Sequence, residues 1–242
     1  MADFLKSRAS EQEETHWLSV SDLMAGLMVV FLFIAIALMR DALEESRRAE
    51  YQRDRIKEVA VAYQETQVDI YNALVSEFSA DLQKWDAEID KDTLTFTFNS
   101  PEVLFAQGKQ ELKDEYRELL ADFFPRYMDV LDQYRDSINE VRIEGHTSSR
   151  WNNTTTPTEA YFLNMQLSQG RTRSVLEYVY SLAEVTPYQG WIKSHIAAVG
   201  FSSSKPVLDE YNNEDFGKSR RVTFRVISNA DIRIKQILEI DG

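Results

Sequence analysis

The sequence predicts an α+β protein in which a single N-terminal transmembrane helix is joined, through a helical linker, to a C-terminal α/β sandwich of βαβαβ order. Three observations lead to this prediction. An uncharged apolar run lies near the N-terminus, residues 40–86 contain neither glycine nor proline, and short alternating segments begin at residue 93. A chain of 242 residues has room for one core of ordinary size plus accessory helix.

The composition excludes several classes of function. The chain has no cysteine, which rules out a disulfide scaffold, an iron–sulfur cluster and a thiolate nucleophile. Its three histidines, His16, His146 and His195, are far apart, so we expect no metal site. The formal charge of −13 argues against a nucleic-acid partner. No nucleophile–base pair or phosphate loop is visible, so we expect no enzymatic activity and no cofactor.

The first element is a membrane span. Residues 23–39 read LMAGLMVVFLFIAIALM, without a charge. A helix over residues 17–39 would be ~34 Å long at about 1.5 Å per residue, enough to cross a bilayer core of roughly 30 Å. The residues before the run are acidic and no A-x-A cleavage pattern follows it. We therefore expect an uncleaved anchor rather than a signal peptide, preceded by a tail at residues 1–16.

Asp22 is the candidate functional residue of this span. It lies about a turn and a half inside, where an acid must stay protonated, find a partner or line a wet path. The residues on its side of the helix are small enough to let a partner helix approach: Ser19, Ala25, Gly26 and Val29. We hypothesise that Asp22 binds and releases a coupling ion. In the alternative, Asp22 merely caps a span that starts at Leu23.

Residues 40–92 are expected to form the helical linker. The early part is charged all round, whereas the later part places apolar side chains on one helical face. These side chains are Ile70 or Tyr71, Leu74, Val75, Phe78, Leu82 and Trp85. Two interpretations remain equally open, a continuous dimeric stalk and a solvated linker followed by one domain helix.

The spacing of the apolar residues changes to every second position at residue 93, and we expect the C-terminal domain to start there. Residues 93–98 alternate threonine with apolar residues, as a half-buried strand does, and Asn99-Ser100-Pro101 should end it. A helix containing Leu119 and Phe124 should be kinked or divided at Pro125. The further elements are strands at 138–144, 195–199 and 222–227 and a helix at about 160–184. His195 is expected to be a strand residue rather than a ligand.

The segment Ser21-Asp22-Leu-Met-Ala-Gly-Leu-Met28 resembles the span of ion-driven stator B subunits, of which flagellar MotB is the best known. Its residue pattern is more similar to that of the B subunit of Zorya anti-phage defence systems than to that of flagellar MotB. The resemblance implies that Asp22 carries a proton or sodium ion, with the proton as our expectation. It also implies a MotA/ZorA-like multi-pass partner, as a pentamer around a homodimer of this chain, in the bacterial inner membrane.

A second resemblance covers roughly residues 93–228 of an expected domain at 93–242. Val141–Thr147, followed by Asn164-Met-Gln-Leu167-Ser-Gln-Gly-Arg171, resembles the OmpA-like peptidoglycan-binding domain. This resemblance implies that Asn164, Leu167 and Arg171 bind peptidoglycan. Their spacing puts all three on one helical face, where a guanidinium could hold a carboxylate through two hydrogen bonds. In the alternative, Leu167 is core, Asn164 bonds locally and Arg171 pairs with a surface acid.

The sequence departs from the OmpA-like pattern at three places. In the OmpA-like pattern an acid that contacts the ammonium group of the ligand follows the threonine, and this sequence has Ser148 in that place. Thr172 replaces an alanine of the pattern. The loop between Thr147 and the expected helix is enlarged by a polar run that contains Trp151. Wall binding would put the C-terminal domain in the periplasm and the N-terminus in the cytoplasm. We give this orientation precedence over the positive-inside rule, by which the excess of arginines after the span favours the opposite orientation. A flagellar stator subunit and a passive membrane-to-wall tether remain the competing functions.

Overall fold

The computed structural model describes residues 2–99, 104–106 and 108–229, and the side chains of these residues except 2–20, 62 and 63. The chain forms two compact units, Met1–Lys57 and Glu58–Gly242. The expected strand stop at Pro101 and the end of the expected domain, 230–242, lie outside the described residues.

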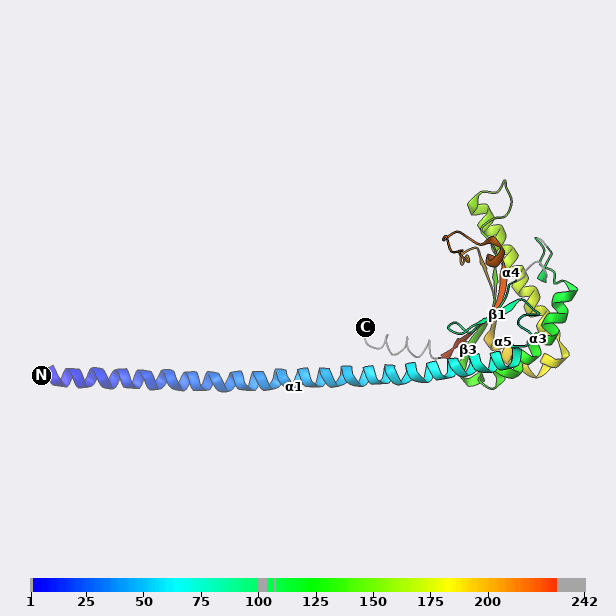
Figure 1. Ribbon diagram of the computed structural model, residues 1–242. Helices are drawn as coiled ribbons and strands as arrows, with labels where there is room; N and C mark the ends of the chain where they lie inside the picture. Colours follow the sequence, from blue (N-terminus) through cyan, green and yellow to red (C-terminus); the bar gives the residue numbers. More distant parts are fainter. Residues whose placement is uncertain (1, 100–103, 107, 230–242) are drawn as a thin grey trace. The chain divides into compact units, whose positions relative to one another are not determined.

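The first unit consists of the greater part of one helix, α1 (Ala2–Phe78), drawn in blue to cyan in Figure 1. No glycine or proline lies between Gly26 and its end, so nothing in the sequence breaks the backbone hydrogen bonding. Among the described residues, α1 is the one helix long and apolar enough to cross a membrane. Its apolar side chains from Leu23 to Met39 are exposed in the single chain.

The second unit begins within α1. Ile70, Leu74 and Phe78, from the predicted apolar face, are fully buried in its core. The helix ends at Phe78, earlier than the glycine-free segment, and turns lead to strand β1 (Ala87–Asp90). The residue pattern does not predict β1, because four residues alternate too briefly to stand out from a linker. Part of the expected linker is therefore domain structure.

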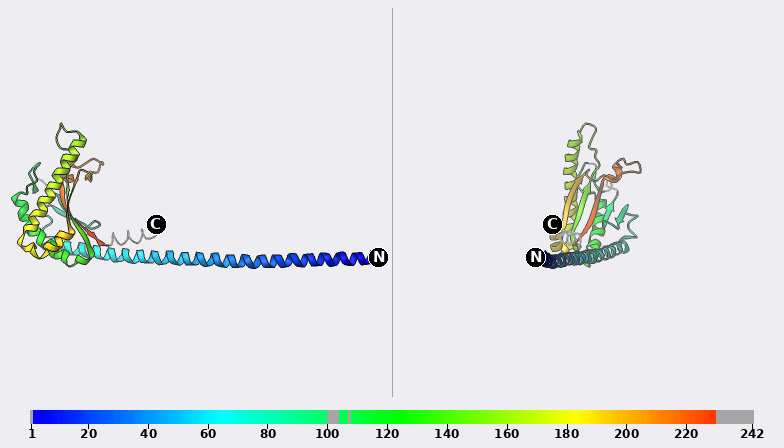
Figure 2. Two further views of the ribbon diagram at one scale, coloured as in Figure 1. Left: turned by 180° about the vertical axis from the view of Figure 1, so that it is seen from behind. Right: turned by 90° about the vertical axis from the view of Figure 1, so that its left-hand side faces the viewer.

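The second unit is a five-stranded sheet with helices on one face, so the predicted α+β class is confirmed. The strand order is β1-β2-β5-β3-β4, with β3 and β4 parallel and the other neighbours antiparallel. Figure 2 shows the strands side by side. The remaining strands are β2 (Thr95–Phe98), β3 (Ile138–His146), β4 (Ile196–Ser202) and β5 (Arg221–Ser228). The helices are α3 (Asp114–Asp132), α4 (Pro157–Ser181) and the short α5 (Gln189–His195) and α6 (Phe216–Ser219).

Two details of these elements differ from expectation. Of the two alternatives at Pro125, a kink or a division, the division is wrong, because α3 continues as one helix through this residue. The hydrogen bond that proline cannot make is offset by the buried apolar face of the helix. His195 is not a strand residue but the last residue of α5, and its ring stacks on Trp191 with centroids 4.8 Å apart. Strand β4 starts one residue later, at Ile196.

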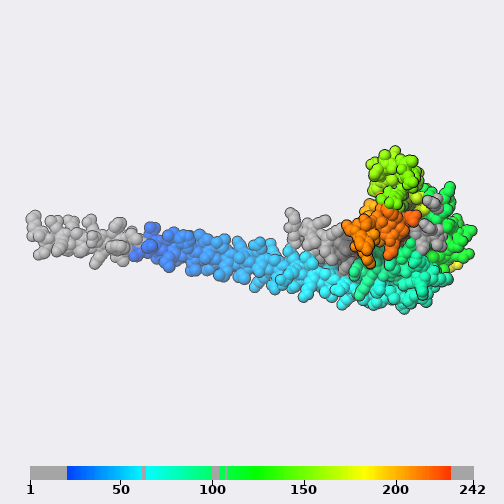
Figure 3. Space-filling model, turned by 45° about the horizontal axis from the view of Figure 1, so that its top comes forward, coloured from blue at the N-terminus to red at the C-terminus, as the bar shows by residue number. Residues whose placement is uncertain are grey.

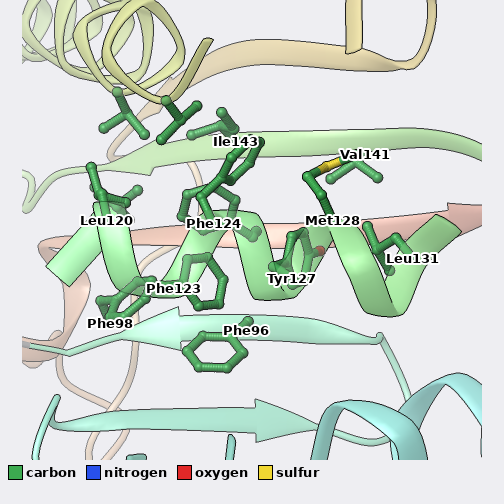
Figure 4. Close-up of a cluster of buried hydrophobic side chains, with 14 of the residues drawn as sticks. Phe96, Phe98, Leu120, Phe123, Phe124, Tyr127, Met128, Leu131, Val141 and Ile143 are labelled. Carbon is green, nitrogen blue, oxygen red and sulfur yellow. The ribbon is translucent and has the colours of Figure 1, made fainter. Parts of the chain in front are cut away.

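The core of the second unit is rich in aromatic rings, and Phe123 of α3 lies among them (Figure 4). Its ring centroid is 4.7 Å from that of Phe96, 5.2 Å from that of Phe78 and 5.1 Å from that of Phe224. These partners belong to β2, α1 and β5. A single fully buried ring therefore joins the incoming helix to the sheet.

Arg126 fastens the end of α1 to α3 at the border of this core. Its guanidinium donates to the Glu77 carboxylate at 2.6 Å, to the Glu77 carbonyl at 2.9 Å and to the Asp81 carboxylate at 3.0 Å. It also lies 4.8 Å from the centroid of the Phe78 ring. Several charge-assisted bonds and a ring contact thus meet on one cation.

Two glycines let α4 lie directly on the sheet. Gly145 of β3 and Gly200 of β4 are register partners on neighbouring strands. A Cβ on Gly145 would lie 2.8 Å from the Ser168 carbonyl oxygen, and one on Gly200 would lie 2.5 Å from the Gln169 backbone nitrogen. The Ser168 hydroxyl accepts a hydrogen bond from the Ser202 backbone N–H at 3.1 Å. The helix is therefore held against the strand ends at backbone distance.

We predict that Gly200→Ala destabilises the second unit by about 1–3 kcal/mol, because the added methyl group meets helix backbone that cannot move aside. Gly190→Ala is the matched control, since no atom lies within 4 Å of its added Cβ. Urea unfolding of the purified chain, followed by tryptophan fluorescence, measures both variants. Equal midpoints for the two variants would contradict the close approach of α4.

Candidate functional site

The three residues expected to bind a ligand lie together on α4. Asn164, Leu167 and Arg171 are 3%, 8% and 9% exposed and line a cleft of about 630 Å³. The other lining residues come from the segments before α3, after β3 and after α6: Phe105, Ala106, Gly108, Lys113, Thr147, Ser148, Arg150, Trp151 and Arg220. One helix and three irregular segments therefore build the cleft.

Helix α4 begins with a complete capping box. The Thr156 hydroxyl accepts a hydrogen bond from the Glu159 backbone N–H, and the Glu159 side chain accepts one from the Thr156 N–H, with Pro157 in the first helical position. Figure 3 shows this yellow-green segment standing out from the rest of the second unit. The cap fixes where the helix starts, and with it the register that brings Asn164 and Arg171 into the cleft.

Arg171 is fixed by backbone rather than by an acid. Its Nε donates to the Lys109 carbonyl at 2.9 Å and its Nη2 to the Ala106 carbonyl at 3.4 Å. The guanidinium carbon lies 4.8 Å from the centroid of the Phe105 ring. These contacts tie the segment before α3 to α4 and orient the guanidinium. Two of its five N–H groups are thereby used, which leaves the others for a ligand.

Asn164 holds the segment after β3. Its Nδ2 donates to the Ser148 carbonyl at 3.0 Å and to the Arg150 carbonyl at 3.3 Å. Both protons of the amide are then engaged, so a ligand would meet the side chain at its acceptor Oδ1. The Asn164 side chain therefore shapes the cleft as well as lining it.

The cleft is strongly cationic in an acidic protein. Lys113, Arg150, Arg171 and Arg220 line it, and none of the described lining residues is acidic. Burial, together with the positive charge of Arg220, lowers the pKa of Arg171 to about 10. Two guanidinium groups that repel each other in a partly buried space favour an anion between or beside them. The arrangement suits a carboxylate ligand.

Sequence reasoning did not identify every lining residue. Phe105 and Lys113 lie in a segment without periodicity, and no pattern marks them as part of a site. Arg220 was not among the residues that the sequence predicted to line a site. Trp151 lines the cleft and remains 37% exposed, a position from which it can stack on a ligand.

The other predicted residue, Asp22, lies in the first unit. Its side chain is exposed on α1, as are those of Ala25 and Val29, and no atom lies within 4 Å of a Cβ built on Gly26. The side chain of Ser19 is outside the described set. This face of the helix is open in the single chain. Among the residues that the structure describes, no group of histidine, cysteine, aspartate and glutamate side chains could hold a metal ion.

A buried pair precedes the cleft at the end of β3. His146 Nε2 lies 3.4 Å from a Glu144 carboxylate oxygen, and the two side chains are almost fully buried. Burial lowers the pKa of His146 despite the hydrogen bond to Glu144. Burial alone would raise the pKa of Glu144, but the bond from His146 and the charges of Lys205 and Arg225 outweigh it and leave that pKa below its usual value. The pair is thus a neutral imidazole donating to a carboxylate.

Comparisons with known proteins agree with this architecture. The model of the OmpA family matches residues 104–220. The chain is 55% identical over 229 residues to the Zorya protein ZorB of Escherichia coli, which covers 95% of this chain and 94% of that protein. It is also 36% identical over 84 residues to the uncharacterized protein YtxE of Bacillus subtilis, covering 35% of this chain and 31% of that protein.

The comparison with solved structures gave two bacterial proteins among its matches. A MotB-like protein from Desulfovibrio vulgaris gives a TM-score of 0.48 at 23% identity, over 72% of this chain and 94% of that chain. The cell wall anchor of the type VI secretion system from Pseudomonas aeruginosa gives a TM-score of 0.44 at 23% identity, over 64% of this chain and 97% of that chain.

We predict that the second unit loses stability as the pH falls below about 6.5, the usual pKa of histidine. In that range His146 is protonated in the unfolded chain but stays neutral in the folded chain, where its pKa is lower, so acid favours unfolding. The free energy of unfolding should fall by at most about 1.4 kcal/mol for each pH unit from this group. Folded Glu144 adds a further loss only below its usual value of 4.5, where the unfolded carboxyl protonates first.

Urea unfolding of the wild type and of His146→Asn at a series of pH values measures this effect. The variant is expected to be less stable throughout, since it alters a buried pair, but its stability should decline less steeply between pH 7 and pH 5. Parallel declines would show that His146 is not buried in its neutral form.

Proposed function

The chain belongs to the ZorB family, and from this premise we propose that it is the peptidoglycan-anchored B subunit of an ion-driven stator motor in anti-phage defence. The observation that carries the proposal is the presence, in one chain, of an acid next to the apolar run of α1 and a cationic cleft in an OmpA-family domain. The first would move an ion and the second would hold the protein still.

The proposed topology follows from the apolar run of α1 and from the cleft of the second unit. Residues 1–16 lie in the cytoplasm, 17–39 cross the bacterial inner membrane, 40–57 link the span to the second unit, and the second unit binds the wall in the periplasm. The exposed apolar side chains of α1 from Leu23 to Met39 support the span, because lipid or another membrane helix would cover them.

We propose Asp22 as the carboxylate that carries the ion, with a proton as the ion. A charged group in an apolar helix is costly, so uptake of a proton would change which helix contacts are favoured. The exposed side that Asp22 shares with Ala25 and Gly26 offers a close approach for another helix. The partner we propose is a MotA/ZorA-like multi-pass subunit, as a pentamer around two copies of this chain.

The anchor would be the cleft on α4. Peptidoglycan stem peptides carry carboxylates, and Arg171 presents a guanidinium oriented by two backbone carbonyls to receive one. Asn164 and Leu167 line the same wall and would bound the ligand beside it. Anchoring holds one component fixed so that ion passage can turn the other.

We predict that Asp22→Asn abolishes protection against phage and ion flux while leaving assembly with the multi-pass partner intact, because the amide keeps the shape but cannot take up a proton. Asp41→Asn, which alters an exposed acid of α1 just beyond the apolar run, is the matched control and should be silent. Plaque assays and flux measurements in vesicles test both. Full protection with Asp22→Asn would leave only the passive tether.

We further predict that Arg171→Ala releases the chain from isolated sacculi. Its control is Arg173→Ala on the same helix, whose guanidinium is exposed and pairs only with Glu177 among the described ion pairs. Co-sedimentation with sacculi in detergent compares the two, and urea unfolding verifies that both remain folded. Wild-type sedimentation by folded Arg171→Ala would remove the cleft from the anchor.

A further inference from the structure

We propose that Trp151 is a specificity-determining residue of the cleft and that its indole stacks on a sugar ring of the wall glycan. The inference rests on the proposed function and deepens it, because it adds a second kind of contact to the carboxylate contact of Arg171. The ligand is then a pyranose of the peptidoglycan backbone that carries a peptide with free carboxylates, rather than the peptide alone.

Trp151 differs in its surroundings from the other tryptophans whose side chains the structure describes. Trp85 is 8% exposed and belongs to the hydrophobic core, and Trp191 packs against that core. Trp151 lines the cleft, is 37% exposed and belongs to neither group. Within the described part of the chain, its indole makes no hydrogen bond, ring stack or cation–π contact. Core packing therefore does not account for this ring, which lies where a ligand can reach it.

The backbone on both sides of Trp151 is held in place. On one side, the Asn164 amide donates a hydrogen bond to the Arg150 carbonyl at 3.3 Å. On the other side, the Asn152 Oδ1 atom accepts hydrogen bonds from the backbone N–H groups of residues 154 and 155, each at 2.9 Å. A ring carried on fixed backbone loses little conformational freedom when a ligand stacks on it, so more of the contact energy appears as affinity.

The residues around the indole suit a sugar better than an apolar ligand. The run from Ser149 to Thr156 is rich in hydroxyl and amide side chains, and those of Asn153 and Thr154 are exposed. A pyranose presents C–H groups on one face, which pack on an aromatic ring, while its hydroxyl and N-acetyl groups need hydrogen-bonding partners. An apolar ligand would remove water from the polar side chains without replacing their hydrogen bonds.

The cleft has room for both contacts. Its volume is about 630 Å³, and clefts of roughly 300–1,000 Å³ are usual for ligands the size of a drug. A single amino acid held by its carboxylate at Arg171 would fill a fraction of this space. In a wall fragment the peptide is joined covalently to the sugar. One ligand can therefore place a carboxylate at Arg171 and a pyranose at Trp151.

The experiment compares two probes that differ in their sugars. The first is the disaccharide peptide that a muramidase releases from peptidoglycan. The second is the same peptide without sugars, synthesised with an acetylated N-terminus so that both probes carry the same charge. Calorimetry on the full chain in detergent should give the disaccharide peptide an affinity at least about fivefold higher, as expected for one ring contact.

Variants then identify the residue responsible. Trp151→Ala should bring the affinity ratio of the two probes close to one, whereas Trp151→Tyr, which keeps an aromatic ring, should preserve most of it. Tyr211→Ala is the matched control, since this ring is 83% exposed but is not among the described residues that line the cleft. Its ratio should equal that of the wild type. Urea unfolding followed by circular dichroism verifies that each variant is folded.

Each outcome decides the inference. Equal affinities of the wild type for the two probes overturn it, and so does a ratio that Trp151→Ala leaves intact. Proportional loss of both probes in folded Trp151→Ala also overturns it, because the indole then supports the peptide contact and not a sugar. If Trp151→Ala fails to fold, Trp151→Leu, which keeps apolar bulk without a ring, takes its place. A wild type that binds both probes equally contradicts the inference alone, whereas binding of neither probe contradicts the proposed function as well.

Discussion

The contact of α4 with the sheet at Gly145 and Gly200 is the constraint on which the cleft depends. No side chain separates helix backbone from strand at this point, so the height of α4 above the sheet is set by backbone atoms. Ser168 and Ser202 then fix its position along the strands through a hydrogen bond. A helix placed in this way presents Asn164 and Arg171 at a defined distance from the loops that they bind.

The buried polar side chains of α4 serve the fold and the site together. Asn164 and Arg171 donate hydrogen bonds to backbone carbonyl oxygens of the two flanking segments. Those segments in turn bring Arg150 and Lys113 to the cleft. An interior made only of apolar side chains would leave the carbonyl groups without donors. Polar burial here therefore has a structural reason that does not depend on any ligand.

The sequence predicted what is periodic and missed what is irregular. Spacings of three and four were enough to place Asn164, Leu167 and Arg171 on one face of a helix, because that helix is long and capped. The contribution of Lys113 depends on a non-periodic segment held by Arg171, and no local pattern encodes it. His195 was misplaced by only one residue, since the boundary between α5 and β4 depends on the packing of Ile192.

The junction of α1 with the second unit has a mechanical consequence. Phe78 is enclosed by aromatic rings, and Arg126 grips Glu77 and Asp81 from another helix. Tension along the last turns of α1 would therefore load these contacts in parallel, as shear, instead of opening them one after another. A joint of this kind yields as a single cooperative event, so a force on α1 would not unravel the second unit progressively from that end.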